Sequence, residues 1–96
     1  MITYEITATV PAETLDAYDQ YMIGQHIADV MATGCFTGAT YYRDGARRRT
    51  TYEAMDQESL DRYLKNDADR LRRHFAEQFH DSVTLTREVW EAMTTI

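Results

Sequence analysis

Apolar and polar residues alternate without interruption near the start of the chain. The apolar positions are Ile2, Tyr4, Ile6, Ala8 and Val10. The positions between them are Thr3, Glu5, Thr7 and Thr9. Because successive side chains of a β-strand point to opposite faces, this period of two predicts a strand over 2–10 with one buried face. Pro11, the only proline, is expected to end it.

The next segment repeats its larger side chains at helical spacing. This first stripe consists of Leu15, Tyr18, Met22, His26 and Val30. Residues three or four apart share one face of an α-helix, so the spacing predicts a helix from about residue 12 to Thr33. Gly34 is expected to stop it, since glycine is the residue most often found just after a helix.

A second stripe follows Asp56, a residue suited to cap a helix N-terminus. It consists of Leu60, Leu64, Ala68, Leu71, Phe75 and Phe79. This spacing predicts one amphipathic helix that continues to Phe79, with a charged opposite face that carries Asn66.

The remaining segments predict three strands. Residues 35–43 and 46–54 flank Asp44-Gly45, a dipeptide suited to the two-residue type I′ turn of a β-hairpin. Near the C-terminus, Val83, Leu85, Arg87 and Val89 alternate with Thr84, Thr86, Glu88 and Trp90. That alternation predicts the closing strand of the fold.

The resulting order, βαββαβ, is that of the ferredoxin-like α+β fold. Residues 1–96 are too few for two independent cores, so we expect a single domain. Its four-stranded antiparallel sheet should have the strand order 4-1-3-2, with both helices on one face. The opposite face should be polar and rich in threonine.

Composition narrows the possible partners. The formal net charge of −6 argues against nucleic acid, because phosphate binding requires clustered Lys and Arg. No segment approaches the roughly 18 consecutive apolar residues of a membrane span, and no signal segment is present, so we expect a cytoplasmic protein that binds no membrane. Cys35 is the only cysteine, and no spacing of His or carboxylate residues suggests metal binding. We therefore expect no metal and no cofactor.

The segment from His26 to Phe36 reads His-Ile-Ala-Asp-Val-Met-Ala-Thr-Gly-Cys-Phe. It resembles the end of the first helix in the dimeric α/β-barrel superfamily, in particular a small bacterial branch of unknown function with a His-Ile-x-x-Val-x-x-Thr-Gly-Cys-Phe motif. That pattern prefers proline at position 28 and an apolar residue at position 19, where this chain has Ala28 and Asp19. The resemblance implies a homodimer in which two sheets form an eight-stranded barrel. Its relatives include cofactor-free monooxygenases, isomerases, haem-handling enzymes and ligand sensors, so the fold selects no function.

His26 is the candidate catalytic residue. A neutral imidazole at the centre of the first stripe could act as a general base, with an ordinary pKa of about 6.5. It could equally be a core histidine with a structural hydrogen bond. Asp19 lies two helical turns away, roughly 10 Å along the helix axis, so a direct pair of the two is not expected.

Tyrosines dominate the expected interface between helices and sheet. Tyr4 and Tyr63 could border a cavity there, and an aromatic or hydrophobic ligand would suit their flat rings and polar tips. The predicted ligand-binding residues are Tyr18, Met22, His26, Tyr41 and Tyr52.

Three consecutive arginines, Arg47 to Arg49, form the only basic run. They could hold an anion, but alternation directs Arg48 to the opposite face. Arg47 and Arg49 are more simply expected to neutralise Glu5, Glu53 and Glu88 on the polar face. Arg48 could stack on Tyr41.

Three functions fit these patterns. The first is a dimer that binds a small hydrophobic or aromatic molecule between helices and sheet. The second is a cofactor-independent isomerase, cyclase or monooxygenase that uses His26. The resemblance implies that a cofactor-free monooxygenase has an asparagine in this cavity, and the only asparagine here, Asn66, is expected to face away from it, which weakens the monooxygenase alternative. The third is a purely structural dimer whose own side chains fill the cavity. An open cavity at His26 would favour the first two.

Overall fold

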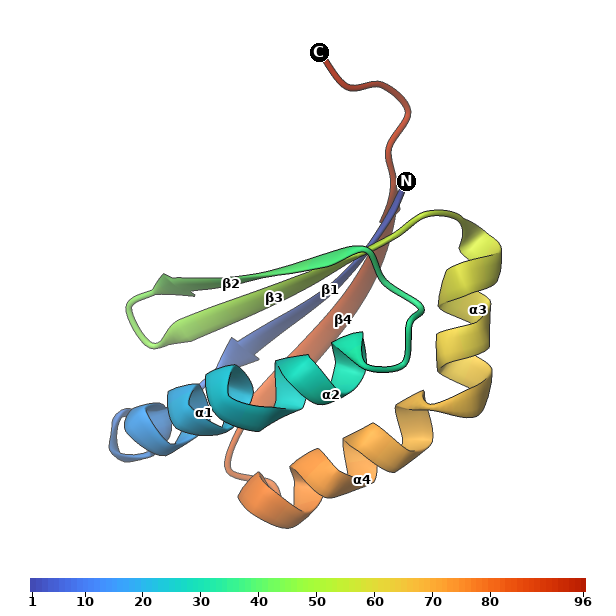
Figure 1. The fold of residues 1–96 in the computed structure, drawn as a ribbon. Helices are drawn as coiled ribbons and strands as arrows, with labels where there is room; N and C mark the ends of the chain where they lie inside the picture. The colour runs from blue at the N-terminus through green and yellow to red at the C-terminus, as the bar shows by residue number, and fades with distance from the viewer.

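The computed structural model describes residues 1–96 as a four-stranded antiparallel sheet with helices on one face (Figure 1). The strands are β1 (Ile2–Thr9), β2 (Gly38–Asp44), β3 (Arg47–Ala54) and β4 (Thr84–Glu91). Their order is β2-β3-β1-β4, which confirms the predicted ferredoxin-like topology. No helix has the length and apolar content that crossing a membrane would require.

The strand register confirms the predicted division of the sheet into two faces. Tyr4 on β1 lies opposite Tyr52 on β3 and Val89 on β4, so all three belong to the helix-covered face. Thr3 lies opposite Glu53 and Trp90 on the uncovered face. The alternation of β1 therefore decides which side chains the helices bury.

The β2–β3 turn differs from the expected type I′ turn. Asp44 pairs with Arg47, so the two-residue loop is Gly45-Ala46 and not Asp44-Gly45. Only Gly45 has a positive φ, of 59°. A glycine at the first central position is characteristic of a type II′ turn, which needs positive φ at that position alone.

The first helical segment is composite. It begins with a 3₁₀ turn, Ala12–Thr14, and continues as α1 (Leu15–Tyr21), a π-helical turn at Met22–His26, and α2 (Ile27–Met31). The helix thus ends two residues before the predicted Thr33, and Gly34 follows with φ of 76°. The positive φ explains why glycine stands there.

The predicted second helix is two helices. Asp56 caps α3 (Gln57–Asn66) as expected, since its Oδ1 accepts a hydrogen bond of 2.8 Å from the Ser59 backbone N–H. Asp67, with φ of −126°, breaks the helix before α4 (Ala68–Phe79). The second predicted stripe was wrong at Leu64, which is 37% exposed; Tyr63 is buried in its place.

The two helices run in different directions in Figure 1, α3 beside one end of the sheet and α4 beneath it. The buried apolar residues form two clusters. One includes Tyr4, Phe36, Tyr52, Leu60, Tyr63 and Leu71. The other includes Ala8, Val10, Tyr18, Tyr21, Met22 and Phe79.

Candidate functional site

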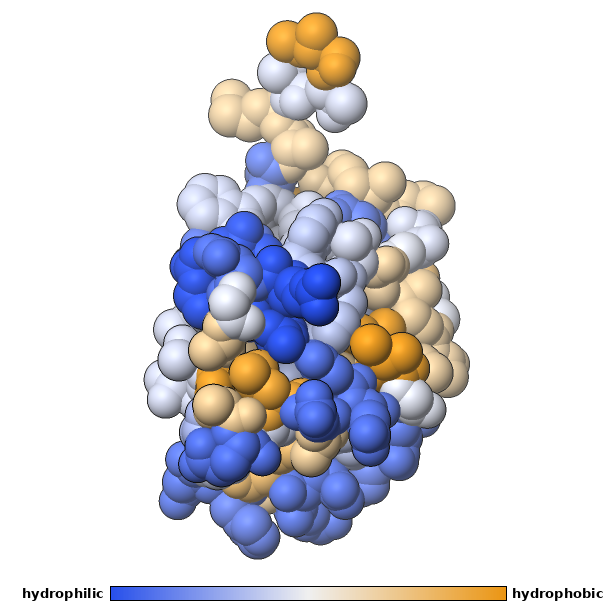
Figure 2. Space-filling model, turned by 90° about the vertical axis from the view of Figure 1, so that its left-hand side faces the viewer, coloured by the Kyte–Doolittle hydropathy of each residue, from blue (hydrophilic) through white to orange (hydrophobic).

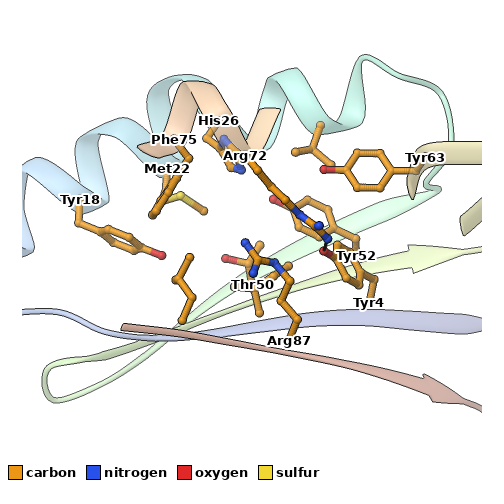
Figure 3. A pocket seen from close by; sticks show the side chains of 13 residues that line it. Tyr4, Tyr18, Met22, His26, Thr50, Tyr52, Tyr63, Arg72, Phe75 and Arg87 are labelled. Carbon is orange, nitrogen blue, oxygen red and sulfur yellow. Dashed lines mark hydrogen bonds between the residues drawn. The ribbon is translucent and has the colours of Figure 1, made fainter. Parts of the chain in front are cut away.

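A cavity of about 40 Å³ lies between the helices and the sheet, lined by residues of both apolar clusters (Figure 3). The sheet contributes aromatic and polar side chains from β1, β3 and β4, and the helices contribute the opposite wall. The polar or aromatic lining residues from the helices are Tyr18, His26, Tyr63, Arg72 and Phe75. Those from the sheet are Tyr4, Thr50, Tyr52 and Arg87. Four of the five predicted ligand-binding residues therefore border one cavity: Tyr18, Met22, His26 and Tyr52.

The π-helical turn explains how the first stripe stays on one face. Tyr18, Met22, His26 and Val30 are spaced by four, and at about 100° per residue a regular α-helix would carry Val30 roughly 120° around from Tyr18. A π turn contains about one extra residue, which removes most of that drift. As a result, all four side chains line the same cavity.

His26 is largely buried between aromatic rings. Its ring centroid lies 5.6 Å from that of Tyr21 and 5.7 Å from that of Phe75. Its Nδ1 has no hydrogen-bond partner in the chain. Burial lowers the pKa of His26 from 6.5 to about 4, and the partly opposing effect of Asp29 does not restore it. The expected ordinary pKa is therefore wrong, and the imidazole is neutral at neutral pH.

Burial also raises the pKa of three tyrosines at the cavity, which keeps their hydroxyls neutral. The Tyr52 hydroxyl is buried without a hydrogen-bond partner, and burial raises its pKa. Burial also raises the pKa of Tyr18 and of Tyr63 to about 12. The cavity thus offers uncharged hydrogen-bonding groups on an aromatic wall.

Two arginines that sequence patterns did not identify also line the cavity. Arg72, on α4, donates a hydrogen bond of 2.9 Å from Nη2 to the Tyr4 hydroxyl. Arg87, on β4, reaches toward the same space from the opposite side (Figure 3). Its position could have signalled this placement, since Arg87 replaces an apolar residue on the buried side of the alternation between Leu85 and Val89.

Tyr41, the fifth predicted ligand-binding residue, is not part of the cavity lining. Its hydroxyl donates a 2.6 Å hydrogen bond to Asp19, which also accepts from Arg48 Nε at 2.7 Å and Nη2 at 3.0 Å. Arg48 is therefore a buried ion-pair partner, as its placement on the covered face allows, and the expected stack on Tyr41 is replaced by a shared carboxylate. The hydrogen bonds from Arg48 hold the pKa of Asp19 below its usual value.

The other two arginines of the basic run are paired on or near the uncovered face. Arg49 lies 3.4 Å from Glu5, as predicted, whereas Arg47 pairs with Asp44 in the hairpin instead of with a sheet glutamate. Glu53 accepts a 2.8 Å hydrogen bond from Thr3. Figure 2, which faces the hairpin end of the molecule, shows the dense hydrophilic surface there.

The remaining candidate groups have structural partners. The Tyr21 hydroxyl and His74 Nδ1 are 2.8 Å apart, a contact between the first helix and α4 that periodicity did not predict. Cys35 is buried and its thiol lies 3.8 Å from the Thr33 carbonyl oxygen. No three His, Cys, Asp or Glu side chains converge in an arrangement that could hold a metal ion.

Residues 1–93 match the family model of a domain of unknown function, DUF4286. The chain belongs to this family. No curated protein matches this DUF4286 chain in sequence.

Solved structures share the fold of this DUF4286 protein at low sequence identity. SnoaB of Streptomyces nogalater, described as a cofactor-independent oxygenase, is 15% identical with a TM-score of 0.76, covering 99% of this chain and 95% of its own. A Deinococcus radiodurans protein described as a candidate antibiotic biosynthesis monooxygenase is 16% identical with a TM-score of 0.75, covering 100% and 96%. The haem degrader MhuD of Mycobacterium tuberculosis is 12% identical with a TM-score of 0.72, covering 100% and 99%. These likenesses establish the fold. They do not test the motif from His26 to Phe36, so its resemblance to one bacterial branch stays a prediction.

Proposed function

We propose that this protein binds a small organic molecule in the cavity between helices and sheet. One observation carries the proposal: the two buried side-chain polar atoms without a hydrogen-bond partner, His26 Nδ1 and the Tyr52 hydroxyl, both belong to residues that line this cavity. An unsatisfied buried polar group costs about 1 to 3 kcal/mol. Two such groups at one cavity are explained if a ligand supplies their partner.

The cavity limits the size of the ligand. A volume of about 40 Å³ is little more than the roughly 30 Å³ that one water molecule occupies in the liquid, whereas a cavity that accommodates benzene is about 150 Å³. The enclosed part of the ligand is therefore a small polar group on a short apolar body. A full aromatic ring requires side chains at the cavity to move outward.

The binding test uses phenol and isobutanol as probes, followed by NMR and thermal unfolding. We expect saturable binding that raises the melting temperature of the wild type. Tyr52→Phe and His26→Gln should each weaken binding by about tenfold, the equivalent of one hydrogen bond. Tyr42→Phe removes only the hydroxyl of a tyrosine on the uncovered face, outside the cavity lining, and keeps its ring; it is the matched control and should bind normally. Equal binding to all variants, or none to the wild type, contradicts the proposal.

A cofactor-independent enzyme that uses His26 is the second candidate function. It is favoured by the unpartnered Nδ1 at the cavity and by the fold shared with SnoaB. A pKa of about 4 makes His26 a weak base, which lowers its power to remove a proton at neutral pH. If turnover exists, its rate should fall as the pH is lowered through about 4, and His26→Gln should abolish it. A rate that falls near pH 6.5 would contradict this assignment of the base.

We also propose that the protein is a homodimer joined through the uncovered sheet face. That face is rich in threonine, yet it exposes 57% of Trp90 and 51% of Tyr42 to solvent. Pairing two such faces would cover these rings. Light scattering should give twice the chain mass of 11.2 kDa, and Trp90→Glu should return it to the mass of one chain. A monomeric wild type would contradict the interface.

A further inference from the structure

We propose that the ligand of this cavity is a small organic acid whose carboxylate is held by Arg87 and Arg72. This inference rests on the proposed function and adds the chemical class of the ligand. Figure 3 shows the two arginine side chains entering the cavity from opposite walls, Arg72 from α4 and Arg87 from β4, with their guanidinium groups directed into the space between. Arg87 is exposed and Arg72 partly exposed, so both lie where the cavity meets solvent.

The charge of the cavity is opposite to that of the protein. The chain has 16 acidic residues against 10 Lys and Arg, for a formal net charge of −6. None of the 13 lining residues is acidic, and two of them are arginines. A site that concentrates positive charge within an acidic protein favours an anion over a neutral or cationic ligand.

The two arginines are also short of partners within the chain. The four ion pairs of the structure involve Arg47, Arg48, Arg49 and Arg70. Arg72 donates one hydrogen bond, to the Tyr4 hydroxyl, and Arg87 is in none of the side-chain hydrogen bonds or ion pairs of the chain. Their planar donor groups match the two oxygens of a carboxylate, which both could bind at once.

Arg87 occupies a position where the fold itself favours an apolar side chain. It lies opposite Ile6 on β1, between Leu85 and Val89, on the face that the helices cover. Burial is the main cause of the lowered pKa of His26, and the positive charge of Arg87 adds a smaller lowering; the same charge partly opposes the rise that burial causes in the pKa of Tyr63. The charge of Arg87 therefore acts on groups inside the cavity.

The polar groups of the cavity differ in exposure. Arg87 is exposed and Arg72 partly exposed, whereas the unpartnered His26 Nδ1 and Tyr52 hydroxyl are buried. Met22, Phe75 and Leu85 supply apolar contacts to the same space. A hydroxy or oxo acid with a short apolar body matches both sets of groups, with its carboxylate at the arginines and its second oxygen at His26 and Tyr52.

The test compares acids with amides of the same shape. Isobutyrate and isobutyramide form one pair of probes, and benzoate and benzamide form a larger pair. Calorimetric titration of the wild type should show each acid binding at least about tenfold more tightly than its amide. Raising NaCl from about 50 mM to about 500 mM should weaken the acids and leave the amides nearly unchanged.

Two variants and one control assign the effect to the cavity. Arg87→Gln and Arg72→Gln should each reduce the preference for the acid to less than about threefold. Arg73→Gln removes the same charge from the next residue of α4, which is exposed and outside the cavity lining, and should keep the full preference.

Each result has a separate meaning. Equal binding of acid and amide by the wild type overturns the anion assignment and leaves the proposed cavity function intact. Binding of neither overturns both. A preference that survives in Arg87→Gln and Arg72→Gln, or disappears in Arg73→Gln, places the anion elsewhere and overturns the assignment. If the cavity variants do not fold, the salt dependence of binding to the wild type decides. Affinities of acids and amides that respond alike to NaCl overturn the assignment.

Discussion

Two groups of polar side chains lie between the helices and the sheet, and they differ in whether their polar atoms have hydrogen-bond partners. The paired cluster consists of Asp19, Tyr41 and Arg48, in which every charged atom has a partner; Arg48 Nη1 also donates to the Gly45 carbonyl oxygen at 2.8 Å. The unpaired cluster consists of His26 and Tyr52, whose buried Nδ1 and hydroxyl have none. The first group stabilises the structure through its ion pair and hydrogen bonds. The second group is the basis of the proposed ligand site, and its unpartnered atoms are expected to cost stability in protein without ligand.

The largest expected effect comes from breaking the paired cluster. Asp19→Ala leaves the buried Arg48 guanidinium without a counter-charge and should lower the free energy of unfolding by about 3 to 4 kcal/mol. Urea denaturation measures this loss. Asp44→Ala removes the exposed partner of Arg47 and should cost less than about 1 kcal/mol. Similar losses in both variants would mean that the two ion pairs are equivalent.

The second effect separates the clusters by pH. His26 has a pKa of about 4 in the folded protein and 6.5 as its ordinary value, so the unfolded state binds the proton more readily. Stability should therefore be full above pH 6.5 and fall as the pH decreases toward 4, by roughly 3 kcal/mol at most. Asp19, in the paired cluster, affects stability in a lower pH range. Its lowered pKa gives stability that is present above pH 3.8 and is lost as the pH falls below that value.

Unfolding curves between pH 7 and pH 4 test this separation. His26→Gln should flatten most of the change in that interval, because no imidazole is left to protonate at this position. Asp19→Asn should leave that interval unchanged and should remove its own contribution only at lower pH. The same pH profile in wild type and His26→Gln would show that the buried imidazole is not the titrating group.

A smaller effect is expected at Tyr41. Tyr41→Phe deletes a hydroxyl that donates to the Asp19 carboxylate and should lower the free energy of unfolding by about 1.5 kcal/mol. Its benzene ring is retained, so packing should change little. A neutral substitution would show that the two guanidinium hydrogen bonds satisfy Asp19 without the tyrosine.

The smallest effect, and the one of opposite sign, is expected at Tyr52. Tyr52→Phe deletes a hydroxyl that has no partner, so the free energy of unfolding should stay the same or rise by up to about 1 kcal/mol in protein without ligand. Denaturation of Tyr41→Phe and Tyr52→Phe side by side gives the comparison. A clear loss at Tyr52 would assign its hydroxyl a structural role and make the two clusters alike.

Periodicity predicted the sheet because each strand carries its own alternation. The strand order and the covered face of β1 followed from residues 2–10 and the βαββαβ order. The break at Asp67 was missed because Leu60 and Leu71 fit a continuous stripe as well as an interrupted one. Only the packing of Tyr63 in place of Leu64 distinguishes the two arrangements.

Sequence spacing predicted part of the cavity lining contributed by the first helix and missed the two arginines of the lining. Tyr18, Met22 and His26 share a spacing, whereas Arg72 belongs to a helix face that looks fully solvated in sequence. Tyr41 was misplaced because its hydroxyl follows Asp19, which lies 22 residues away. Contacts between side chains far apart in sequence leave no periodic signal. Hydrogen bonds between such side chains therefore could not be predicted from the sequence pattern.

The π-helical turn at Met22–His26 sets how the helical segment before it is rotated relative to the segment after it. Gly24 lies within this turn, and a Cβ placed on it would meet no other atom within 4 Å. Deletion of Gly24 with a return to regular α-helix would leave Tyr18 and His26 seven residues apart, about 700° around the helix, so the two side chains would still face the same space. If the chain keeps its length and the turn becomes regular α-helix instead, the segment before the turn rotates by about 100° relative to the segment after it, and the two side chains separate. In members of such a family, a chain that is one residue shorter here can therefore keep this geometry in a regular helix, whereas a chain of the same length keeps it only through a π turn.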